Sequence, residues 1–158
     1  MAQCRLASQK EDAEMRSYLD EMQKMVVGTA TVLVDDQRCF YDILTKEFEP
    51  RLTHFVGAVD SSRGCYFVSE ATPKEYQPLV VAHEHLCLMH KAKGRSHYCL
   101  QALREELTFI PDSMDWEAYI RFRRAFFDDF VKYGKGSTNT EFWRAVTESR
   151  DFLRSFNV

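Results

Sequence analysis

The sequence predicts a mostly α fold: a single-domain helical bundle of five to seven helices over residues 1–158, with residues 1–8 flexible. Three observations lead to this prediction. Apolar residues recur every three to four positions through most of the chain, which is the period of a helix buried on one side. Glycine and proline are scarce, at 6 and 4 residues, so few breaks interrupt that pattern. Hydrophobic residues make up 45% and charged residues 28%, which suits one domain around one core.

The N-terminal half contains the segments that are hardest to assign. The apolar spacing predicts a long helix over about 8–34, although its β-branched end also fits a strand over 29–34. A second helix is expected over 36–48. Residues 52–59 show helical spacing, whereas 64–70 is short, aromatic and β-branched and fits no single state. A small β-hairpin around 53–69, pairing 53–59 with 65–69, is an open alternative.

The C-terminal half carries clearer helical patterns. Apolar spacing and flanking breakers predict four helices, at about 78–93, 97–109, 113–133 and 139–156. Gly94 is the expected stop of the first of them, because glycine readily adopts the left-handed conformation that ends many helices.

Charge and composition exclude several classes of protein. The net charge is −3 and the 21 basic residues are spread along the chain, so no nucleic-acid-binding patch is expected. No apolar run approaches the ~18 residues of a membrane helix, and the N-terminus lacks the apolar core of a signal peptide. The five cysteines are widely spaced without a CxxC pair, which argues against a disulfide framework. A cytoplasmic protein with no membrane partner is predicted.

The stretch VVAHEHLCLMH, residues 80–90, is the main candidate for a site. At about 100° per residue, Cys87 and His90 fall within about 40° of His83, so the three share one helix face. His83, Glu84 and Cys87 have the spacing of the HExxH zinc motif with cysteine in the second ligand position. The sequence therefore offers His83, Cys87 and His90 as ligands of zinc or iron, with Glu84 as general base. The favoured interpretation is a packed helix whose histidines bond to neighbours.

Residues outside this stretch could extend such a site. Cys99, on the next predicted helix, would approach Cys87 if the two helices form an antiparallel pair, although core packing is the favoured role for its thiol. His54 or His97 could complete a metal site in space, which no sequence spacing decides.

Arg123 is a second anomaly, because it lies in the middle of the aromatic face of its helix. A buried guanidinium needs a partner, and a structural ion pair with Glu84 or Glu106 is the favoured interpretation. The functional alternative is an anchor for an anionic ligand, with Trp116 and Tyr119 lining the same site.

These features lead to three hypotheses about function. No complete catalytic set is visible, so the favoured hypothesis is a non-enzymatic binding or regulatory module that acts on a protein partner or on its own copy. The first alternative is a metal-binding protein or metal-dependent hydrolase that uses the helix of His83. The second alternative is a helical small-molecule sensor with its anion anchor at Arg123.

Overall fold

The computed structural model describes residues 2–29, 32–34, 37–42, 47–49, 58–60, 65–68, 72–133 and 140–158. Most of these residues belong to five α-helices, which confirms the predicted mostly helical bundle. They are α1 (Ala2–Lys24), α2 (Gln77–Ala92), α3 (Tyr98–Thr108), α4 (Trp116–Tyr133) and α5 (Thr140–Arg154), with a short 3-10 turn, η1 (Lys74–Tyr76), before α2.

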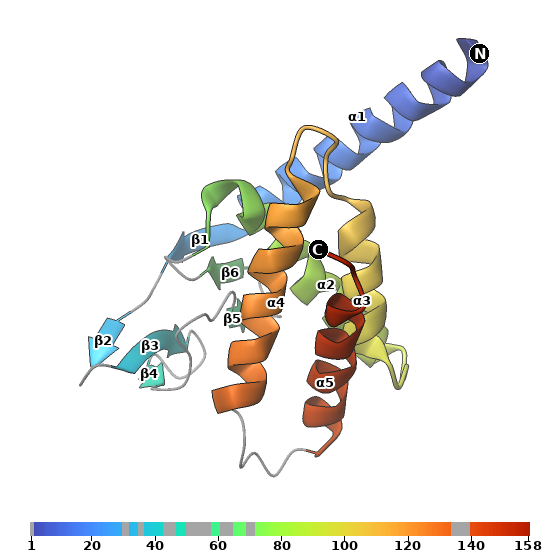
Figure 1. Ribbon diagram of the computed structural model, residues 1–158. Coiled ribbons are helices and arrows are strands. Elements are labelled where there is room, and N and C mark those ends of the chain that lie inside the picture. The colour runs from blue at the N-terminus through green and yellow to red at the C-terminus, as the bar shows by residue number, and fades with distance from the viewer. Residues whose placement is uncertain are drawn as a thin grey trace.

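The helices pack in an order that differs from their order in the chain. α2 lies between α1 and α3, and α5 lies between α3 and α4. Figure 1 shows α4 and α5 side by side and the N-terminal part of α1 projecting away from the other helices. The C-terminal part of α1 buries Leu19 and Met22 in the core. Among the described residues, none of the helices combines the length and apolar character needed to cross a bilayer.

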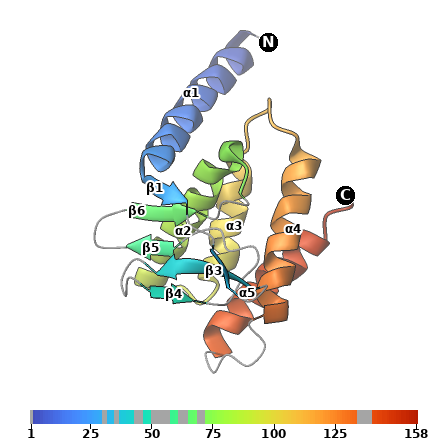
Figure 2. The same cartoon turned by 90° about the vertical axis from the view of Figure 1, so that its left-hand side faces the viewer.

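Short strands form a second layer beside α2 (Figure 2). One three-stranded sheet has the order β1-β6-β5, with β1 parallel to β6 and β5 antiparallel to it. Its strands are β1 (Val26–Thr29), β5 (Ala58–Asp60) and β6 (Cys65–Val68). The antiparallel pairing of β5 with β6 agrees with the hairpin alternative around 53–69, of which 53–57, 61–64 and 69 lie outside the described residues. A second group, antiparallel throughout, contains β2 (Val32–Val34), β3 (Gln37–Asp42) and β4 (Glu47–Glu49).

The predicted helix over 8–34 is confirmed as far as Lys24 and wrong beyond it, and the predicted helix over 36–48 is wrong. α1 begins at Ala2 and ends at Lys24, and the chain then enters β1, while β3 and β4 occupy most of 36–48. The strand considered for 29–34 is the better match, since β1 ends at Thr29 and β2 begins at Val32. Pairing with distant strands decides the state here: the N–H of Tyr66 donates to the carbonyl of Met25 at 2.8 Å. The flexibility expected for 1–8 stays a prediction.

The four C-terminal helices agree with their predicted positions. Gly94 ends α2 with φ at +72°, the left-handed conformation expected of it, and its N–H donates to the carbonyl of Lys91. α4 begins at Trp116, three residues later than predicted. The reason is local, because the carboxylate of Asp115 accepts the backbone N–H of Ala118 at 3.1 Å and so caps the first turn.

Arg124 ties the end of the chain to α4. Its guanidinium donates to the carbonyl oxygens of Leu153 and Val158, both at 2.9 Å, and to that of Phe156. Leu153 lies in the last turn of α5, and Phe156 and Val158 follow that helix. The bonds of Arg124 hold α5 against α4, and both helices contribute walls to the site described next.

Candidate functional site

A small pocket of about 60 Å³ lies where four helices meet. α2 and α3 supply its polar groups, and α4 and α5 supply apolar walls. The lining residues are His83, Glu84, Cys87, Tyr98, Cys99, Phe126, Phe127, Ala145 and Val146. This volume admits a few atoms and is far below the several hundred Å³ of a typical ligand pocket.

Three side chains at this pocket lie close enough together to hold a metal ion. One ring nitrogen of His83 and the Sγ atoms of Cys87 and Cys99 all lie within 4.8 Å of one another. Nε2 of His83 is 3.6 Å from Sγ of Cys99. With Zn–S near 2.3 Å and Zn–N near 2.0–2.1 Å, a tetrahedral ion separates its nitrogen and sulfur ligands by about 3.6 Å. The spacing therefore suits a tetrahedral metal ion.

The structure brings His83 and Cys87 together, as their shared face predicted, and adds Cys99. His90 does not join them. Its Nε2 lies 2.8 Å from the carboxylate of Glu105, and its Nδ1 lies 2.5 Å from a guanidinium nitrogen of Arg95. It shares a helix face with His83, but seven residues place it about 10 Å further along the axis. One ion cannot span that rise.

The other candidates lie apart from the cluster or beside it. His97 pairs with Glu148 at 2.9 Å on the surface, away from the three ligands. His54 lies outside the described residues. Glu84 is half-buried and lines the pocket, so the structure places this carboxylate next to the ligand set. Burial raises its pKa, and the His83 cation opposes that shift.

Behind the ligands lies a fully buried carboxylate, Glu106. Its Oε2 is 2.8 Å from Nδ1 of His83. Arg123 contacts both carboxylate oxygens, with Nε 2.9 Å from Oε1 and Nη2 3.1 Å from Oε2, and the Tyr119 hydroxyl donates to Oε1. A carboxylate on the far nitrogen of a histidine orients the ring and makes it a better ligand. Glu106 therefore holds Nε2 of His83 toward the sulfur of Cys99.

Arg123 has the structural partner that was favoured for it. The side chain is 1% exposed, is paired with Glu106, and stacks on Phe126 and Phe127 with its guanidinium carbon 4.8 and 5.0 Å from the ring centres. Trp116, in contrast, is 38% exposed and meets Phe156 edge-on. Arg123 and Tyr119 thus share Glu106 as their partner, whereas Trp116 contacts Phe156 instead.

The charges at the cluster reinforce one another. A hydrogen bond from Cys87 lowers the pKa of Cys99 well below its usual value, burial opposes this, and His83 and Ser149 add to the lowering. The same bond and burial raise the pKa of Cys87, so the proton of the pair stays on Cys87. Burial alone would lower the pKa of His83, but the negative charges of Cys99 and Glu106 raise it to about 10.

The sequence did not predict two contacts of the site, that of Glu106 with His83 and that of Ser149 with Cys99. Glu106 was considered only as a partner of Arg123, and Ser149 was not considered. The Ser149 hydroxyl lies 3.1 Å from Sγ of Cys99 and equally far from the carbonyl of Ala145, and its single proton serves one of them at a time. A signal existed for Glu106, because seven residues place it on the same face of α3 as Cys99, in an apolar stripe.

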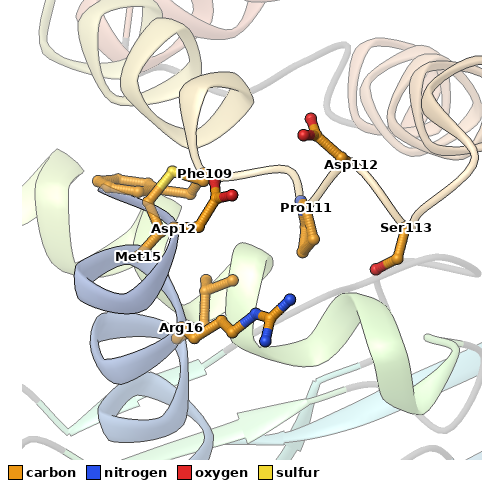
Figure 3. A pocket seen from close by; sticks show the side chains of 8 residues that line it. Asp12, Met15, Arg16, Phe109, Pro111, Asp112 and Ser113 are labelled. Atoms are coloured by element: carbon orange, nitrogen blue, oxygen red, sulfur yellow. The ribbon is translucent and has the colours of Figure 1, made fainter. Parts of the chain in front are cut away.

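A second pocket, of about 50 Å³, separates α1 from the connection between α3 and α4 (Figure 3). It is lined by Asp12, Met15, Arg16, Leu19, Phe109, Pro111, Asp112 and Ser113. Figure 3 shows Arg16 reaching from α1 toward Pro111 and Ser113. Neither histidine nor cysteine is among these lining residues, so this pocket offers neither an imidazole nor a thiol.

Comparison with family models, with curated proteins and with solved structures finds no match to this chain. The chemistry of His83, Cys87 and Cys99 and of their neighbours is therefore the basis for inferring a function.

Proposed function

We propose that this protein binds a transition-metal ion, zinc before iron, through His83, Cys87 and Cys99. The observation that carries the proposal is the 3.6 Å separation of Nε2 of His83 from Sγ of Cys99, with Sγ of Cys87 in the same group. Two thiolates and an imidazole at tetrahedral spacing suit zinc better than the hard cations that prefer oxygen ligands.

The surroundings of the three ligands support the same proposal. Metal binding requires Cys87 and Cys99 as thiolates and His83 with Nε2 free of its proton. In the metal-free protein the negative charges of Cys99 and Glu106 keep both ring nitrogens of His83 protonated, so the metal ion would displace the proton of Nε2 while Glu106 retains the proton of Nδ1. A cytoplasmic location, which also remains a proposal, fits because reducing compartments keep cysteines available as ligands.

A cobalt titration of the full chain, purified without a histidine tag, tests the proposal. Co²⁺ should bind at one equivalent and give a thiolate-to-metal charge-transfer band that Cys87→Ser and Cys99→Ser each weaken. His90→Gln is the matched control, because His90 shares the helix face but not the cluster, and this variant should keep the band. An unchanged spectrum in both cysteine variants would refute the proposed ligands.

A metal-dependent hydrolase is a second candidate function. The observation that favours it is the position of Glu84, which lines the same pocket as the three ligands. Three protein ligands leave one position of a tetrahedral ion for a further group, and a carboxylate beside that position can take a proton from water. Glu84→Gln should keep the cobalt spectrum and slow the hydrolysis of a small activated ester such as 4-nitrophenyl acetate. Equal rates in both proteins would contradict this role.

The protein-binding module and the anion sensor stay predictions with less support. Among the described side chains, the large apolar ones that are exposed are Leu88 and Trp116, and Trp116 also contacts Phe156. The guanidinium of Arg123 already pairs with the carboxylate of Glu106. Glu106 therefore neutralises the positive charge that an anionic ligand would need. The metal cluster therefore has the stronger structural basis.

A further inference from the structure

The two cysteines of the cluster form a close sulfur pair across α2 and α3. Both thiols are free, their Sγ atoms are at most 4.8 Å apart, and a hydrogen bond joins them. A disulfide needs about 2 Å between the sulfurs, so the gap to close is less than about 3 Å. Side-chain rotation can provide much of this, because α2 and α3 pack directly against each other.

The environment of the pair gives a small oxidant access to it. Cys87 is half-buried and lines the pocket, whereas Cys99 is 6% exposed but lines the same pocket. Ser149 and His83 lie 3.1 and 3.6 Å from the sulfur of Cys99, and both can donate to a thiolate there. The pocket of about 60 Å³ has room for a molecule of the size of hydrogen peroxide.

We propose that Cys87 and Cys99 form a dithiol–disulfide couple, and that its oxidation by a peroxide expels the metal ion. Sulfur attacks one peroxide oxygen, the O–O bond breaks, and a sulfenic acid and one water result. The second sulfur then attacks the sulfenic sulfur, the S–S bond forms, and the hydroxide leaves as a second water. Two metal-bound thiolates, one hydrogen peroxide and two protons from the solvent give one disulfide and two waters, so the metal ion changes no oxidation state.

Release of the ion follows from ligand loss and rests on the proposed function. A disulfide sulfur is a poor ligand compared with a thiolate, and oxidation removes two of the three proposed ligands together. His83 alone would then hold the ion. Reduction of the disulfide by a thiol such as dithiothreitol would restore the site.

The test treats the zinc-loaded full chain with hydrogen peroxide and follows three quantities: zinc released to a chromophoric chelator, free thiols, and the linkage found by peptide mapping. The expected result is one zinc released per disulfide, with a Cys87–Cys99 linkage that dithiothreitol reverses. A variant with Cys4→Ser, Cys39→Ser and Cys65→Ser is the matched control, because it retains only this pair and should respond alike. Peptide mapping of the unmodified chain gives the same information if that variant does not fold.

The outcomes separate this inference from the proposed function. Oxidation that yields sulfinic acid or other linkages, with no Cys87–Cys99 linkage, overturns the couple even if zinc binds. A Cys87–Cys99 disulfide that forms while zinc stays bound overturns the release. A reversible disulfide in a chain that never binds metal refutes the proposed function and leaves the couple standing.

Discussion

Oε2 of Glu106 lies 2.8 Å from Nδ1 of His83, and the other nitrogen of that ring lies 3.6 Å from Sγ of Cys99. The same carboxylate receives Arg123 on both oxygens. One buried group thus joins the candidate metal ligands to the ion pair at the centre of the core. Its removal should affect the folding of the chain and the affinity of the site together.

Glu106→Gln should destabilise the metal-free protein by about 3–5 kcal/mol, because it leaves the guanidinium of Arg123 buried without its counter-charge. Urea unfolding followed by circular dichroism measures this. Glu117→Gln is the control, since Glu117 pairs with Arg121 at 3.1 Å on the exposed surface of α4 and should cost less than about 1 kcal/mol. Equal effects in the two variants would show that Glu106 is not the anchor of the network.

Arg123→Met should also be strongly destabilising, and its effect should not add to that of Glu106→Leu. Either single change leaves one buried charge unpaired, whereas the double change removes both charges. We expect the double variant to be more stable than the sum of the single losses implies, by at least about 1 kcal/mol. A double-mutant cycle of unfolding free energies measures the coupling, and simple additivity would contradict the ion pair.

The stability of the metal-free protein should fall in acid partly through Glu106. Burial alone would raise the pKa of this carboxyl, but Arg123 and His83 lower it below its usual value of 4.5. A lowered folded pKa means that the stabilisation is present above the unfolded pKa and is lost as the pH falls through the folded one. The stability difference between the wild type and Glu106→Gln should therefore shrink below about pH 4.5. Urea unfolding at several pH values measures this difference in stability. A difference that grows as the pH falls would contradict the prediction.

Gly94→Ala should destabilise the protein by about 1–2 kcal/mol, because the φ of +72° at the end of α2 is costly for a residue with a Cβ. An added Cβ would meet no atom within 4 Å, so the cost comes from the backbone alone. Gly94→Asn should lose less, since asparagine tolerates this conformation. Thermal unfolding of both variants tests the order, and an alanine variant as stable as wild type would contradict it.

The helices from Gln77 onward could be predicted because their signals are local. Gly94 stops α2 through its own conformation, and Asp115 caps α4 within one turn. The region of β1 to β4 could not be predicted in this way. Its strands depend on partners elsewhere in the chain, such as Phe40 with Glu49 and Val26 with Tyr66. Apolar residues at a spacing of three and four fit a helix equally well until those partners are known.

The candidate site was predictable only along one helix at a time. The helical period placed His83 and Cys87 on one face, and the approach of Cys99 to Cys87 was foreseen as an option. The helical period gives the angle at which each side chain leaves the helix axis. His90 was grouped with His83 because their angles are similar, although the two residues lie about two turns apart along α2. The contact between Glu106 and His83 joins α3 to α2, and no spacing within either helix specifies it.

The metal content of the full chain, expressed without a histidine tag and measured by elemental mass spectrometry, tests the central claim most directly. We predict about one zinc ion per chain, lost in Cys99→Ser and retained in His90→Gln, with a lower melting temperature after treatment with a chelator. Less than about a tenth of an equivalent of any transition metal, together with melting that chelator leaves unchanged, would contradict the metal site.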